Sequence, residues 1–105
     1  NSEVELQPKI PTLKVIYPNP SNIHVNFVIQ IHQGFQLATA YIKIFDVLGR
    51  SVAEIPLPAT PSAGGELTVT WNGKTSAGRM GATGTYTALL FVDGQICSQK
   101  FILLK

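Results

Sequence analysis

Apolar and polar side chains alternate over nine consecutive residues, from Ile23 to Ile31. The odd positions are all isoleucine, valine or phenylalanine, and the even positions are mostly polar. Successive side chains of an extended strand point to opposite faces, so a period of two predicts a strand with one buried face. A chain with this pattern needs a sheet whose apolar face packs against another layer.

Shorter runs of the same kind fill most of the remaining chain, and none shows a helical period of useful length. Turn residues separate the runs every 8 to 12 positions, which is the spacing of an immunoglobulin-like sandwich. We therefore predict an all-β sandwich of about seven antiparallel strands, with a small closed barrel as the alternative. The other six predicted strands are Leu13–Tyr17, Ala40–Val47, Ser51–Leu57, Leu67–Trp71, Gly84–Val92 and Gln95–Leu104.

Three turn signals carry specific expectations. In the segment from Asp46 to Arg50, the aspartate is expected to accept hydrogen bonds from the following backbone amides, with Gly49 at a positive φ. Asp93 and Gly94 form a two-residue hairpin signal. Pro18 and Pro20 end the first strand, which predicts an edge strand or one that passes between sheets.

The length of 105 residues suits one domain with one core. Residues 1–12 are expected to form a linker or edge segment, and residues 13–105 the domain. Only 13% of the residues are charged, against about 25% in a typical soluble protein. A module that rests against a partner tolerates such a surface. The eight basic residues are scattered and the net charge is +2, which does not indicate a nucleic-acid site.

No set of residues in the sequence suggests chemistry. Cys97 is the single cysteine, so an internal disulfide is excluded. His24 and His32 lie about 27 Å apart on an extended strand, too far to share a metal ion. The six carboxylates are dispersed. We expect no enzyme activity, no cofactor, no metal and no small-molecule substrate.

Four segments together resemble a known family. Tyr17–Asn22 is similar to its opening YPNPFN motif, with Ser21 at the usual phenylalanine, and Ile42–Val52 is similar to VxIYDxLGRxV. Trp71–Lys74, followed by Gly78 and Gly84–Tyr86, resembles WDGxxxxGxxxxxGxY, with Asn72 at the usual aspartate. Lys100–Lys105 resembles the basic and apolar tail. These motifs are those of C-terminal sorting domains of type IX secretion cargo, and the third is shared with the immunoglobulin-like domain of flagellar hook-capping proteins.

This resemblance implies a domain that serves as the sorting signal for export of the protein to which it is attached. The parent protein would cross the inner membrane by a signal peptide and be bound in the periplasm by outer-membrane secretion machinery. A sortase-like peptidase then removes the domain in many such proteins, and the passenger remains at the cell surface. The first residue is Asn1 and not methionine, so we expect an upstream passenger domain and export signal.

The predicted docking residues lie mainly on the last strand. If Phe101 and Leu103 point inward, the intervening side chains form an apolar outer face flanked by lysines, and surfaces of this kind mark interaction sites. The strand edge is expected to accept a partner strand or to support an edge-strand dimer. The docking candidates are Lys100, Ile102, Leu104 and Lys105, together with Pro18, Asn19 and Pro20.

A second set of residues is expected to be structural. Trp71 shares the inward parity of its strand, which predicts a core anchor whose indole N–H needs an acceptor. Tyr86 is expected to bond to backbone upstream, as in a tyrosine corner. The set consists of Gly49, Trp71, Gly73, Gly84 and Tyr86.

Two other functions remain open at this point. One is a structural spacer or assembly module of an exported enzyme or of a protein similar to hook-capping proteins. The other is a carbohydrate-binding module, which needs a flat row of exposed aromatic rings, and Tyr41 with Phe45 is the pair available.

Overall fold

Strands make up all the regular structure of the described chain. The computed structural model describes residues 12–22, 24–31, 40–58, 65–92 and 94–104, so Ile23, His32, Asp93 and Lys105 lie outside it. All seven predicted strands are confirmed; the last two have the predicted bounds, and the ends of the other five differ. They are β1 (Thr12–Asn22), β2 (His24–Ile31), β3 (Tyr41–Phe45), β4 (Ser51–Pro56), β5 (Gly65–Trp71), β6 (Gly84–Val92) and β7 (Gln95–Leu104).

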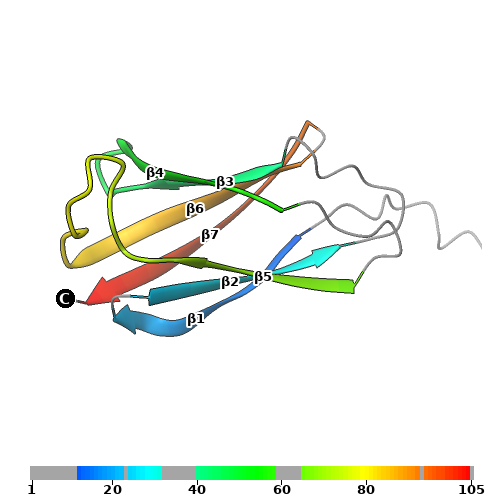
Figure 1. The fold of residues 1–105 in the computed structure, drawn as a ribbon, viewed down its shortest axis with the longest axis horizontal. Coiled ribbons are helices and arrows are strands. Elements are labelled where there is room, and N and C mark those ends of the chain that lie inside the picture. Colours follow the sequence, from blue (N-terminus) through cyan, green and yellow to red (C-terminus); the bar gives the residue numbers. More distant parts are fainter. Residues whose placement is uncertain (1–11, 23, 32–39, 59–64, 93, 105) are drawn as a thin grey trace, which may run out of the picture.

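The strands form two layers joined along one side. Hydrogen bonding follows the order β4-β3-β6-β7-β1-β2-β5, and Figure 1 shows β4, β3, β6 and β7 in one layer facing β1, β2 and β5 in the other. The terminal strands β4 and β5 do not pair with each other. The fold is therefore the predicted immunoglobulin-like sandwich and not the closed barrel.

The first strand joins the two layers. Its first half, from Thr12 to Tyr17, is antiparallel to β2, whereas Ser21 and Asn22 pair with Leu103 and Leu104 of β7 in parallel. This short parallel ladder departs from the predicted all-antiparallel pairing. Pro18 and Pro20 lie between the two halves, where their missing N–H groups cost no ladder bond. Of the two alternatives for this strand, passage between sheets is the one observed.

The alternation of β2 builds one wall of the core. Val25, Phe27 and Ile29 are fully buried, and His24 is exposed. Val28 belongs to the outer set and is nevertheless only 8% exposed. It lies between Val15 of β1 and Thr68 of β5, whose side chains shield it.

The alternation of β7 closes the core from the opposite layer. Phe101 and Leu103 are 1% and 2% exposed, whereas Ile102 and Leu104 are each 43% exposed. The Phe101 ring contacts three other rings, with centroid distances of 5.6 Å to Phe27, 5.7 Å to Tyr86 and 6.3 Å to Trp71. Because Phe27 and Trp71 belong to the facing layer, Phe101 joins the two sheets.

The expected linker or edge segment, residues 1–12, lies outside the described chain except for Thr12. That residue belongs to β1. No helix among the described residues has the length and apolar character to cross a membrane.

The contrast between neighbouring β7 residues gives a stability prediction. Phe101→Ala is expected to lower the free energy of unfolding by about 3–5 kcal/mol, because it leaves a cavity among three rings. Ile102→Ala is expected to cost about 1 kcal/mol or less, because that side chain is half-exposed. Urea unfolding followed by Trp71 fluorescence measures both. Equal losses for the two variants would contradict the observed orientation of β7.

Candidate interaction surface

The outer face of β7 presents three of the predicted docking residues. Lys100, Ile102 and Leu104 are all exposed. In the sheet, Lys100 lies beside Thr87 and Ile102 beside Thr85, both from β6. The prediction that these side chains share an outer face is confirmed, whereas Lys105 lies outside the described chain.

The segment Pro18–Pro20 lies against this strand. Its three residues are exposed, and the Asn19 side-chain Oδ1 accepts a hydrogen bond from the Ile102 backbone N–H at 3.0 Å. Asn19 therefore has a structural role, since it ties the segment between the two sheets to the last strand. The same bond brings the two sets of docking candidates, which are about 80 residues apart in sequence, onto one continuous surface.

The edge of β7 is not available to a partner strand. The Leu13 N–H donates to Sγ of Cys97, and Nε2 of Gln99 donates to the Leu13 carbonyl, both at 3.4 Å. Further along, Ser21 pairs with Leu103. The sequence left open whether the edge of the last strand is free, and in the sheet β7 lies between β6 and β1. Among the described strands, the terminal positions in the sheet order belong to β4 and β5.

The turn between β3 and β4 is held by one carboxylate. Asp46 Oδ1 accepts hydrogen bonds from the backbone N–H groups of Leu48 and Arg50, each at 2.9 Å. Its Oδ2 accepts another from Nε of Arg50 at 2.9 Å. Gly49 has a φ of +82°, a conformation that glycine adopts without steric cost. Both expectations for this turn are confirmed, and the turn displays Val47 and Leu48 at 80% and 73% exposure.

These hydrogen bonds stabilise the ionised form of Asp46. The backbone N–H of Arg50 is the largest influence, and it lowers the pKa of Asp46 below the ordinary value of 3.8. Desolvation is the second-largest influence and acts in the opposite direction, while the guanidinium and the Leu48 amide lower the pKa further. At neutral pH the carboxylate is therefore ionised, which is the form that accepts these hydrogen bonds.

Trp71 is the predicted core anchor. It is 3% exposed, and its indole Nε1 donates to the Lys74 carbonyl at 2.8 Å. Asn72 Oδ1 accepts the Lys74 N–H at 2.9 Å. The amide oxygen of Asn72 accepts this bond as a carboxylate oxygen would. The turn therefore forms with asparagine at the position of the usual aspartate. Gly73 adopts a φ of +80°, which the turn requires.

Tyr86 forms the predicted bond to upstream backbone, with its hydroxyl donating to the Ala82 carbonyl at 2.5 Å. Burial raises the pKa of Tyr86 above its ordinary 10.0, so it stays protonated and able to donate. Gly81 is a structural residue that the sequence did not single out. A Cβ there would lie 3.1 Å from the Leu103 side chain and 3.2 Å from the Gly73 carbonyl. Gly84 meets no such crowding.

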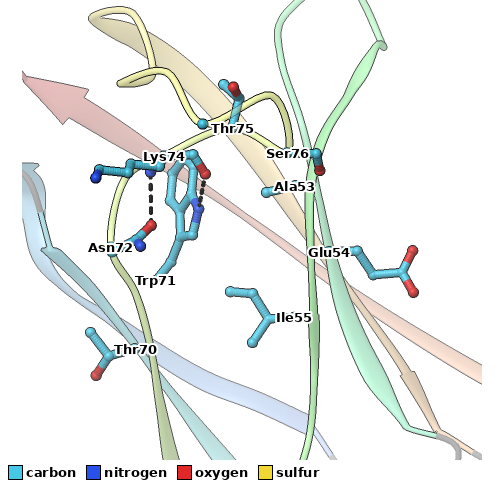
Figure 2. Close-up of a pocket in the computed structure, with 10 residues that line it drawn as sticks. Ala53, Glu54, Ile55, Thr70, Trp71, Asn72, Lys74, Thr75 and Ser76 are labelled. Carbon is cyan, nitrogen blue, oxygen red and sulfur yellow. Dashed lines mark hydrogen bonds between the residues drawn. The ribbon is translucent and has the colours of Figure 1, made fainter.

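A depression of about 430 Å³ lies between β4, the end of β5 and the loop that follows β5. Figure 2 shows that Glu54 points away from the Trp71 indole and from Lys74. No acid–base pair converges there, and no group of three metal-ligating side chains occurs among the described residues.

Neighbouring side chains contact the aromatic rings of Tyr41 and Phe45 on the outer face of the four-stranded layer. Tyr41 stacks on Phe91 at 4.7 Å with an interplanar angle of 18°, and Lys43 Nζ lies 5.9 Å from the centroid of the Phe45 ring. One face of the Tyr41 ring and one of the Phe45 ring are therefore occupied. This arrangement disfavours the carbohydrate-binding alternative, because sugars stack on open ring faces.

The Asp46 turn gives a prediction for acid stability. A lowered folded-state pKa means that the stabilisation is complete above the unfolded value of 3.8 and is lost as the pH falls through the folded value. We expect Asp46→Asn to be less stable than the native chain near neutral pH, and the difference to shrink as the pH falls below the unfolded value of 3.8. Unfolding free energies measured across this range test it. A difference that is independent of pH would contradict the role of the ionised carboxylate.

Three solved structures resemble this sandwich, and two of them belong to much longer proteins. Dimeric latent PorU from Porphyromonas gingivalis superimposes with a TM-score of 0.68 at 19% identity, over 95% of this chain and 10% of PorU. PorZ from the same organism gives a TM-score of 0.55 at 23% identity, over 87% of this chain and 11% of PorZ. FlgD from P. aeruginosa gives 0.50 at 21% identity, over 90% of this chain and 67% of FlgD. The chain thus spans about a tenth of the first two proteins.

No curated protein sequence matches the chain. Residues 24–90, from β2 to near the end of β6, match the FlgD Ig-like domain family. The match covers well over half of the 105 residues, and the observed sandwich agrees with it. This chain therefore belongs to the FlgD Ig-like domain family.

Proposed function

We propose that this chain is a non-catalytic sorting and anchoring domain, which type IX secretion machinery recognises in order to export a larger passenger protein. The observation that carries the proposal is the orientation of β7. Phe101 and Leu103 fix the strand in the core, while Ile102 and Leu104 remain 43% exposed beside the exposed Lys100. The strand is thus held rigidly by one face and presents the other to a partner.

The structural comparisons support this proposal in two ways. The same sandwich occupies only about a tenth of PorU and of PorZ, as expected for a module attached to a larger protein. PorZ is an essential bacterial surface component of the type-IX secretion system. A domain of this fold in an exported protein would pass through the periplasm and reach the cell surface or the medium.

The proposed mechanism is non-covalent docking on the outer face of β7. Lys100 attracts an acidic receptor, and Lys105 extends the same charge in the sequence. Ile102 and Leu104 supply the apolar contact, since burial of such side chains provides most of the affinity at an interface. Asn19 holds Pro18 and Pro20 against the strand, so these residues border the same surface. A sortase-like peptidase would act after docking.

A structural spacer or assembly module is the second candidate, and one observation favours it. The family match ends at residue 90, before β7, so family membership by itself does not extend to the strand that carries the proposed signal. In that case the sandwich would serve as a spacer or assembly unit that contacts the adjacent domains of the parent protein.

A secretion assay tests the sorting proposal. The 105 residues are fused to the C-terminus of a reporter with a signal peptide, in a cell with a type IX system. We expect the reporter at the cell surface, and roughly tenfold less of it with the double variant Ile102→Ser and Leu104→Ser. That estimate follows because the exposed parts of two such side chains contribute about 1–3 kcal/mol when buried, and about 1.4 kcal/mol is a factor of ten.

The matched control is Val15→Ser, since Val15 is 41% exposed on β1 in the opposite layer. It is expected to leave export unchanged, and urea unfolding confirms that all variants are folded. Retention of the native fusion in the periplasm would overturn the sorting proposal and favour the spacer. An equal loss with Val15→Ser would show that the outer face of β7 is not the signal.

A further inference from the structure

A groove of about 310 Å³ lies on the outer face of the four-stranded layer, away from the edge between β4 and β5. We refer to it as the β6 groove, because residues of β6 form its floor. In the sheet register, Phe45 of β3 lies beside Thr87 of β6, and Thr87 lies beside Lys100 of β7. The groove is lined by Phe45, Asp46, Val47, Gly49, Thr85, Thr87, Leu89 and Lys100.

One wall of the β6 groove is apolar and fixed in place. Val47 is 80% exposed, and Phe45 is half-buried beside it. The turn that carries Val47 is held by the hydrogen bonds of Asp46 to Leu48 and Arg50. A side chain displayed on a rigid turn loses little conformational entropy when a partner covers it, which favours binding.

The opposite side of the groove carries one lysine, Lys100. A second lysine, Lys43, lies over the Phe45 ring, near the apolar wall and outside the groove lining. Ion pairs elsewhere in the described chain join Lys14 to Glu66 and Arg50 to Asp46, and neither Lys100 nor Lys43 belongs to them. The carboxylate that lines the groove, Asp46, already accepts a bond from Arg50. The groove therefore presents positive charge that no described carboxylate neutralises by an ion pair.

The outer face of the opposite layer differs in its charge. Val15 of β1 is exposed there, but the lysine next to it in sequence, Lys14, is paired with Glu66. Positions on β2 and β5 carry hydroxyl and amide side chains, such as Thr70, whose Oγ1 donates to Asn26 Oδ1 at 2.7 Å. Lys100, which is in no ion pair among the described residues, lies on the face that also carries Ile102 and Leu104.

We infer that the β6 groove binds an acidic segment of a protein partner, with an apolar side chain against Phe45 and Val47 and a carboxylate at Lys100. A second copy of this chain is a poor occupant, because six acids against eight bases leave it with a net charge of +2. A flat bilayer fits poorly into a concave groove. The inference rests on the proposed sorting function only for the identity of the partner, which would be the acidic receptor docked on β7.

Nuclear magnetic resonance tests this binding without any secretion step. The ¹⁵N-labelled 105-residue chain is titrated with two probe peptides, acetyl-Glu-Phe-Glu-Leu-amide and acetyl-Gln-Phe-Gln-Leu-amide. We expect saturable shifts of the Phe45, Thr87 and Lys100 amides with the acidic probe, and roughly tenfold weaker binding of the neutral one. Lys100→Gln is expected to remove that difference. Lys14→Gln, on the opposite layer, is the matched control and is expected to keep it.

Three results would overturn the inference. They are no saturable shift with millimolar acidic probe, equal binding of the two probes, and equal shifts at Thr68 on the opposite layer. Phosphatidylglycerol vesicles provide a further comparison. If they broaden the groove amides while the acidic probe has no effect, a membrane surface is the partner and the inference fails. A failure of export alone leaves these peptide results unchanged, so the two proposals fail separately.

Discussion

The contact of Phe101 with rings from both layers is the interaction on which the rest of the structure depends. Its ring stacks on Tyr86 from its own sheet, with 22° between planes, and meets Phe27 from the facing sheet edge-on at 81°. The Trp71 ring also meets it nearly at a right angle. Edge-to-face and offset-stacked rings add stabilisation beyond the apolar area that they bury. These contacts fix which side of β7 points inward and therefore which side chains remain outside.

The first strand adds a second constraint that acts on the same element. Because β1 pairs with β2 at its start and with β7 at its end, it closes the side of the sandwich where β7 would otherwise have a free edge. β6 pairs with β7 along its length. On the other side, β1 pairs with Leu103 and Leu104 and forms further hydrogen bonds with the Cys97 and Gln99 side chains. Because β1 occupies the place of a neighbouring strand, we expect a partner of β7 to bind the side chains of its outer face. A partner would therefore dock on the outer face of β7 and would not extend the sheet at its edge.

Much of the fold could be predicted from local sequence. Alternation located the strands, Asp46 and Gly49 identified a turn, and the parity of Trp71 placed it in the core. Other features depend on contacts between distant segments. The path of β1 along β7 rests on bonds such as that of Asn19 to Ile102, which no local pattern encodes. Gly81 resembles the other small residues of its loop, and its tight packing against Leu103 follows only from the tertiary structure.

The docking candidates divide in the same way. The exposure of Ile102 and Leu104 follows from strand parity and was predicted. The β6 groove was not, since it requires Phe45, Thr87 and Lys100 to be side by side. That arrangement is set by the registers of β3 with β6 and of β6 with β7. A turn restricts the register of the two strands that it connects. The alignment of β3, β6 and β7 depends on two registers at once, so no single local segment of the sequence predicts it.

The central claim is that the core holds β7 by alternate side chains and leaves the intervening ones accessible. Hydroxyl-radical footprinting of the native chain, read residue by residue by mass spectrometry, tests this without any substitution. The account predicts rapid oxidation of Ile102 and Leu104, with Phe101 and Leu103 protected until the chain unfolds. Similar oxidation rates at all four positions, or faster oxidation of Phe101 and Leu103, would contradict it.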